Sequence, residues 1–207
     1  GTGTLTISAG TIDNTTSGSI TNAGNNAITL GGSFTFGGTQ DLNLGTGAIT
    51  NAGSRTITLN GTARTLTLGG TMTNGVAGVQ TTTVNGAGNT LVLGGYALSN
   101  SATSRIDFIT GSGNVTITGV VANGGTATAS GLTYTGTGTL TLSGNNTYDG
   151  LTKLNSATGT LTLSGNNSTA TGGVTLTTGI LNINNANALG TGTLTISAGT
   201  IDNTTSG

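Results

Sequence analysis

Short triplets that alternate apolar, polar and apolar residues recur along the whole chain. They are LTI at Leu5, ITL at Ile28 and Ile57, FTF at Phe34, LNL at Leu42, LTL at Leu66, LVL at Leu91, VTI at Val115, VTL at Val174 and LNI at Leu181. Successive side chains of a strand point to opposite sides, so each triplet predicts a strand of about three to five residues with one buried side. The triplets are bounded by GG, NG, GTG or SGNN, which favour turns. No stretch carries an apolar stripe with helical spacing, so we expect an all-β protein with no helix.

Longer repeats join these triplets into units of one strand and one turn. GTLTLSGNN occurs at Gly138–Asn146 and again at Gly159–Asn167. ITNAG occurs at Ile20–Gly24 and again at Ile49–Gly53, and both copies are followed by ITL. Repetition at this scale is typical of architectures in which similar supersecondary units stack on one another.

The longest repeat links the two ends of the sequence. Gly1–Gly18 and Gly190–Gly207 carry the same sequence, GTGTLTISAGTIDNTTSG. An identity of this length predicts a tandem array. We therefore expect residues 1–189 to form one repeat unit and residues 190–207 to begin the next, so that both copies adopt the same backbone, displaced along the axis by one unit.

Two all-β architectures fit short strands with frequent turns, namely an antiparallel sandwich or barrel and a solenoid of parallel strands. The brevity of the strands, the recurrence of one pattern from turn to turn and the tandem identity favour the solenoid. The absence of Pro fits as well, since each strand needs its N–H groups for its neighbours. Coils of roughly 21–25 residues give about eight coils per unit, which rises roughly 40 Å at a strand spacing of ~4.8 Å.

The same alternation separates inward from outward positions. Inward columns are expected to include Leu5, Ile7, Leu140, Leu142, Leu161, Leu163, Leu194 and Ile196. The intervening Thr residues are expected to form outward ladders, at Thr4, Thr6, Thr139, Thr141, Thr160 and Thr162. Flat Thr ladders resemble the ice-binding arrays of some insect antifreeze proteins, but Thr is also simply a good strand former that solvates well.

Composition narrows the function classes. Only 4% of residues are charged, against roughly 25% in typical domains, and the formal net charge is −1. Such a chain has no basic surface for nucleic acid. It has no His and no Cys, which excludes a disulfide framework and thiolate metal sites. No apolar run approaches the ~20 residues of a membrane span, so we expect no membrane insertion, and we interpret the sequence as an excerpt from a longer protein.

The second half of the chain resembles a known family. Gly136–Gly150 has the sequence GTGTLTLSGNNTYDG, and Thr175–Ile196 has TLTTGILNINNANALGTGTLTI. Together with GVVANGG at Gly119–Gly125, these motifs are similar to the autotransporter-associated β-strand repeat. The resemblance covers roughly residues 119–207 and 1–10, and departs from the family where Asp149-Gly150-Leu151 replaces its usual glycine pair.

This resemblance implies a right-handed parallel β-helix in a protein at the surface of a bacterium or outside it. The family carries no catalytic residues, so none transfers to this chain, and we expect no enzyme activity and no cofactor. The expected function is a structural stalk or filament segment. Its expected partners are further units of the same chain and laterally packed sister filaments. The alternative is an adhesin-type module that binds cell-surface polysaccharide or a host surface.

The acidic residues provide the candidates for catalysis or metal binding. Asp13, Asp41, Asp107, Asp149 and Asp202 are scattered along the chain, and none lies in the glycine-rich repeat of calcium-binding β-rolls. Asp107 lies close to Arg105 in sequence, and we expect a surface ion pair of little energetic value. Asp149 is interpreted as a turn residue. We therefore expect no catalytic site and no metal site.

Overall fold

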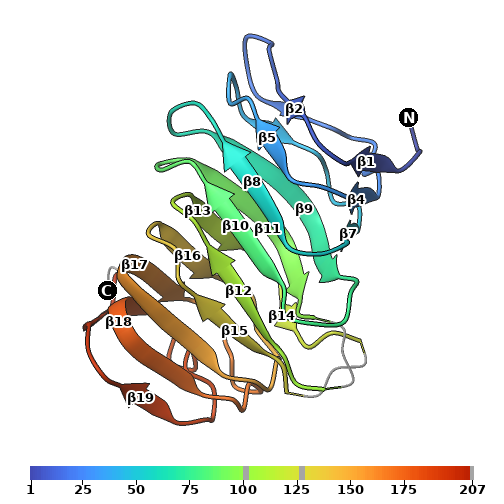
Figure 1. Cartoon of the computed structure of the whole chain (residues 1–207). Helices are drawn as coiled ribbons and strands as arrows, with labels where there is room; N and C mark the ends of the chain where they lie inside the picture. Colours follow the sequence, from blue (N-terminus) through green and yellow to red (C-terminus); the bar gives the residue numbers. More distant parts are fainter. Residues whose placement is uncertain (100–102, 126–128, 206–207) are drawn as a thin grey trace.

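The computed structural model describes residues 1–99, 103–125 and 129–205, and these form a parallel β-solenoid of about eight turns (Figure 1). Every strand pairing is parallel, and each strand pairs with its equivalent in the next turn. Leu5 lies opposite Ile28 and Ile57 lies opposite Val84, so the length of a turn varies along the solenoid. The described residues contain no helix, and so none long and apolar enough to cross a membrane.

The strands fall into three columns, which we call faces A, B and C in the order in which the chain visits them. Face A holds β1 (Leu5–Ile7), β4 (Ile28–Leu30), β7 (Ile49–Asn51), β14 (Val121–Ala122), and the later parts of β9 (Thr65–Asn74) and β11 (Thr90–Ala97). After β14, face A continues without strands through backbone hydrogen bonds at Thr147 and Asn167. The chain thus passes each face once per turn.

Faces B and C run the whole length of the solenoid. Face B holds β2 (Thr11–Ile12), β5 (Phe34–Phe36), β8 (Arg55–Leu59), β10 (Thr81–Asn85), β12 (Ile106–Thr110), β15 (Gly131–Tyr134), the first parts of β17 (Thr152–Leu163) and β18 (Val174–Ile183), and β19 (Leu194–Ile196). Face C holds β3 (Ile20–Thr21), β6 (Leu42–Asn43), the first parts of β9 and β11, β13 (Asn114–Ile117), β16 (Thr139–Leu142), the later parts of β17 and β18, and β20 (Thr200–Asp202).

Four strands are longer than the sequence pattern predicts. β9, β11, β17 and β18 have 10, 8, 12 and 10 residues, because each continues from one face to the next without a break. A pattern of short alternating triplets cannot show whether the backbone bends or runs straight through a corner, since both leave the alternation intact.

The core consists of stacked columns of apolar side chains. On face C the register superposes Leu66, Leu91, Val115, Leu140, Leu161 and Leu181, and all six are buried. Like therefore stacks on like, which fills the interior at a spacing fixed by the backbone hydrogen bonds.

A column of glycines follows these leucines at the corner between faces C and A. A Cβ atom on Gly94 would lie 1.8 Å from the carbonyl oxygen of Gly69, and one on Gly144 would lie 2.0 Å from that of Gly119. The backbones of neighbouring turns approach too closely here for any side chain. This contact explains why GG or SG follows the strand in so many turns.

Candidate functional site

The most polar part of the interior surrounds Asp107, at the corner between faces A and B. Asp107 is only 1% exposed and points inward from β12. Its carboxyl group accepts hydrogen bonds from the side chain of Asn74 (2.7 Å) and from the backbone N–H groups of Gln80 (3.1 Å) and Ser99 (2.8 Å), and also from the Ser99 hydroxyl. One carboxyl group thus joins three successive strands and the loops between them.

The network extends from Asn74 to neighbouring turns. The Asn74 side chain also donates to the hydroxyl of Tyr96 at 3.0 Å and accepts from the side chain of Asn51 at 2.8 Å. The Tyr96 hydroxyl lies 3.3 Å from that of Thr82. Burial raises the pKa of Tyr96 to about 12, and the negative charge of Asp107 adds to the increase. We call Asn51, Asn74, Thr82, Tyr96, Ser99 and Asp107 the buried polar network.

The position of Asp107 corrects the expected surface ion pair. Arg105 lies before β12 begins, and no ion pair joins it to Asp107, although both belong to the described residues. Strand alternation begins at Ile106, which is 46% exposed, so that Asp107 points inward. Because the carboxyl group is enclosed, a molecule bound at the surface cannot reach it. Its role is to satisfy loop N–H groups that have no partner in the neighbouring turn.

The exposed aspartates link neighbouring turns instead. Asp149 accepts hydrogen bonds from the side chains of Asn123 (2.8 Å) and Thr171 (3.2 Å), one turn to either side. Asp13 accepts from the hydroxyl and N–H of Thr39 at 2.6 and 3.0 Å, and these bonds hold the pKa of Asp13 below its ordinary value. Asp41 accepts from the N–H of Thr65 at 3.0 Å. Across the described residues, no three acidic side chains come together as a metal site.

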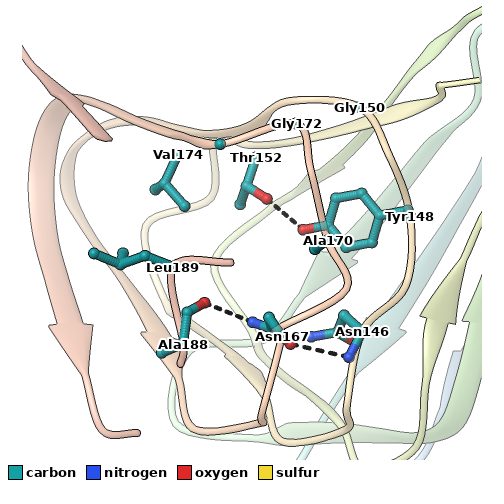
Figure 2. A pocket seen from close by; sticks show the side chains of 11 residues that line it. Asn146, Tyr148, Gly150, Thr152, Asn167, Ala170, Gly172, Val174, Ala188 and Leu189 are labelled. Atoms are coloured by element: carbon teal, nitrogen blue, oxygen red, sulfur yellow. Dashed lines mark hydrogen bonds between the residues drawn. The ribbon is translucent and has the colours of Figure 1, made fainter. Parts of the chain in front are cut away.

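A ladder of asparagines closes the interior near the C-terminal end (Figure 2). The side-chain oxygen of Asn167 accepts from the N–H of Asn146 at 2.9 Å, and its side-chain nitrogen donates to the carbonyl of Ala188 at 2.6 Å. The Tyr148 hydroxyl contacts that of Thr152 beside this ladder. The cavity between them has room for about one water molecule, so it is a packing gap rather than a ligand pocket.

The Thr residues of the expected ladders do not share one face. Thr139 and Thr160 are paired on face C, as are Thr141 and Thr162. Thr4 and Thr6 belong to the first turn and lie at face A. On face C the ladder is interrupted, because Val92 and Asn182 occupy the register positions of Thr116 and Thr162 in other turns. The outward surface is therefore a mixed Thr and Asn face.

The expected inward residues lie at their columns, but their burial depends on their turn. Ile7, Leu140, Leu142, Leu161 and Leu163 are buried, whereas Leu5 and Leu194 are half-buried. Ile196 is 52% exposed, which corrects the expectation of a buried core residue. It lies opposite buried Leu176 on the inward side of β19, but no described strand pairs with β19 on its other side.

The two identical segments adopt the same local structure on different faces. Gly10 and its copy Gly199 both have positive φ angles, of 92° and 107°. The N–H of Asn14 donates to Asp13 at 2.8 Å, as does that of Asn203 to Asp202. However, β1 lies on face A and its copy β19 on face B, so the copy is displaced along the axis and also moved round it by one face. Ser206 and Gly207 lie outside the described residues.

Comparisons with known proteins add no relative to this picture. No family model matches the chain, and neither a curated protein nor a solved structure matches it. The parallel β-solenoid of about eight turns is therefore established by the strand pairing of this chain itself.

Proposed function

We propose that this chain is a structural segment of a long, tandemly repeated β-solenoid that forms a stalk or filament. The observation that carries the proposal is the identity of residues 1–18 and 190–207, combined with their equal ability to form a turn of the solenoid. A turn that serves both at the start and at the end of a unit allows the unit to be repeated without a cap between copies.

Contacts between turns support a mechanical role. Exposed Asp149 and buried Asn167 each join their turn to a neighbouring one, and the glycine column draws the backbones together. In a solenoid of this kind stability is approximately a sum of turn and interface contributions. Additional units therefore lengthen the rod without requiring a larger core.

The family resemblance of residues 119–207 and 1–10 supplies the finer part of the proposal. It implies that the segment belongs to a protein at the surface of a bacterium or secreted from it, with right-handed winding, further units of the same chain as neighbours, and sister filaments packed at its sides. On this proposal the chain needs no cofactor and has no enzyme activity. The alternative is an adhesin-type module whose outward Thr and Asn face binds cell-surface polysaccharide.

Electron microscopy of chains with one, two and three copies of residues 1–189, each followed by residues 190–207, tests the structural proposal. We expect straight rods that lengthen by roughly 40 Å for each added copy. Separate beads on a string, or rods of constant length, would contradict it. A glycan array tests the alternative, and specific binding that is lost on Thr141→Lys would favour the adhesin over a purely structural segment.

A further inference from the structure

The last described turn presents an open pairing edge whose natural complement already exists in this chain. β19 and β20 pair with β18 on one side, and no described strand pairs with them on the other. Ile196 and Ile201 are consequently 52% and 41% exposed. Their sequence equivalents in the first turn, Ile7 and Ile12, are covered by the following turn and are 4% exposed and half-buried.

The first turn shows which segment covers this sequence. Leu5 pairs with Ile28 and Ile7 with Leu30, and the N–H of Leu5 donates to the carbonyl of Ala27 at 2.8 Å. Thr11 pairs with Thr35, and Ile12 with Phe36. Side chains add to this pairing. The Asn26 side chain donates to the carbonyl of Gly1 at 2.8 Å, and the Thr39 hydroxyl donates to Asp13 at 2.6 Å.

Each acceptor in this set has an identical copy at the open edge. Gly190 repeats Gly1, Leu194 repeats Leu5, and Asp202 repeats Asp13. The two copies also share the local hydrogen bonds and the positive φ angle described above. The edge formed by residues 190–205 therefore offers the same groups in the same local geometry to a segment with the sequence of residues 26–44.

A change of face does not prevent this pairing. ITNAG begins β3 on face C and recurs in β7 on face A, and the ITL that follows it forms β4 on face A and the centre of β8 on face B. The same short sequence therefore forms a strand on whichever face the lengths of the preceding turns place it.

We propose that residues 190–205 are a docking edge for a second copy of this chain, which adds its residues 26–44 to the edge in the register that residues 1–16 have within one molecule. In the second copy this edge replaces its own first turn. Because the exchanged sequences are identical, the new pairing between molecules is equivalent to the pairing that it replaces within one molecule. The displaced residues also regain conformational freedom, which opposes the entropic cost of association. Full chains join head to tail as a result.

The same pairing fixes the geometry of a tandem array, and in that respect the inference deepens the proposed function. Face A is passed at β1, β4, β7, β9, β11 and β14 and then at Thr147, Asn167 and Asn187, which makes eight turns from the first passage to the last. β19 follows on face B. Each unit then begins one face further round than the last, so that its surface features wind around the filament.

Cysteine cross-linking tests the docking register, because the chain has no Cys of its own. Thr6 lies opposite Thr29 within one molecule, so Thr195, the copy of Thr6, is expected opposite Thr29 of another. Neighbouring strands lie about 4.8 Å apart, which suits a disulfide. The full chain with Thr29→Cys and Thr195→Cys should give a ladder of disulfide-linked multimers under mild oxidation at rising protein concentration.

Three controls make the result specific. Thr6→Cys with Thr29→Cys should cross-link within one molecule, lock the first turn in place and remain monomeric. Ile196→Asp should abolish the ladder, whereas Ile106→Asp, at a similarly exposed isoleucine on the side of the solenoid, should leave it unchanged. A purely monomeric Thr29→Cys, Thr195→Cys chain at all concentrations would overturn the proposal.

Two further outcomes would also overturn it. A ladder from Thr6→Cys with Thr195→Cys would show that intact copies stack like on like, and loss of the ladder on Ile106→Asp would place the contact on the side of the solenoid. Failure of these tests is distinguishable from failure of the proposed function, because the lengthening of rods with added units in one chain does not depend on exchange between molecules.

Discussion

Around Asp107 the interior of the solenoid holds carboxyl, amide and hydroxyl groups, whereas around Leu161 it holds only stacked aliphatic side chains. The difference follows the loops. Near Asp107 the chain crosses from face A to face B through residues 75–80 and 98–105, where in the first turns residues 31–33 and 52–54 suffice. Longer loops bring backbone N–H groups that no neighbouring turn satisfies, and an inward carboxyl group accepts them.

The comparison teaches that the interior of a solenoid is set by its corners as well as by its strands. Where corners are tight, backbone groups pair from turn to turn and the interior stays apolar. Where a corner is long, burial of polar groups is tolerated only when each is hydrogen-bonded. The two regions therefore differ in how they should respond to substitution.

Removal of the central carboxyl group should have the largest effect. Asp107→Ala leaves the Asn74 side chain and the N–H groups of Gln80 and Ser99 buried without an acceptor. At about 1–3 kcal/mol for each unsatisfied group, the free energy of unfolding should fall by at least about 3 kcal/mol. Urea unfolding measures it. Asp149→Ala, at an exposed turn, is the matched control and should cost less than about 1 kcal/mol.

Truncation in the apolar region should cost almost as much, but for a different reason. Leu161→Ala opens a cavity between Leu140 and Leu181, and a loss of about 2–5 kcal/mol is expected. Leu194→Ala removes the same atoms at the open last turn, where the side chain is only half-buried, and should cost clearly less. Equal losses at the two positions would show that stacking by the next turn does not determine the cost.

Alkaline pH should weaken both regions. Burial raises the pKa of Tyr96, in the polar network, and of Tyr148, beside the asparagine ladder, to about 12, above the ordinary value near 10. A raised pKa means that their contribution is complete below pH 10 and is lost as the pH rises toward 12, by at most about 2.7 kcal/mol for each tyrosine. Unfolding midpoints measured from pH 8 to 12 check this. Absorbance that shows free tyrosine ionisation near pH 10 in the folded chain would contradict it.

Outward positions should be almost neutral. Thr141→Ala changes a half-exposed side chain on the outer side of β16, and a change within about 0.5 kcal/mol is expected by the same urea measurement. A loss comparable with that of Leu161→Ala would mean that the Thr face is covered in solution.

Much of the fold could be predicted from the sequence. The triplet alternation locates nearly every strand, the distance between the two copies of GTLTLSGNN gives the length of a turn, and the pairing of Leu140 with Leu161 follows from the same repeat. These predictions hold because they depend on neighbouring residues and on the stacking of like on like.

The buried polar network could not be predicted in the same way. Ile106, Asp107, Phe108 and Ile109 place apolar residues on both sides of the strand, so alternation does not decide which side faces inward. The register with β10 and the unpaired N–H groups of the long loops decide it, and they bring Asp107 and Ile109 inside. The partners of Asp107 include Ser99 in the preceding loop and Asn74 in an earlier turn, and no local pattern indicates such distant positions.

The sequence by itself determined the local structure, as the two copies of LTISAG show, because hydrogen bonds and backbone angles within a strand and its turn depend on residues only a few positions apart. The tertiary structure alone decided on which face each copy lies and how far it is buried. Ile7 is 4% exposed and Ile196 is 52% exposed, although their neighbours in sequence are identical. Burial requires a next turn, and the position of that turn depends on the summed lengths of all the turns before it.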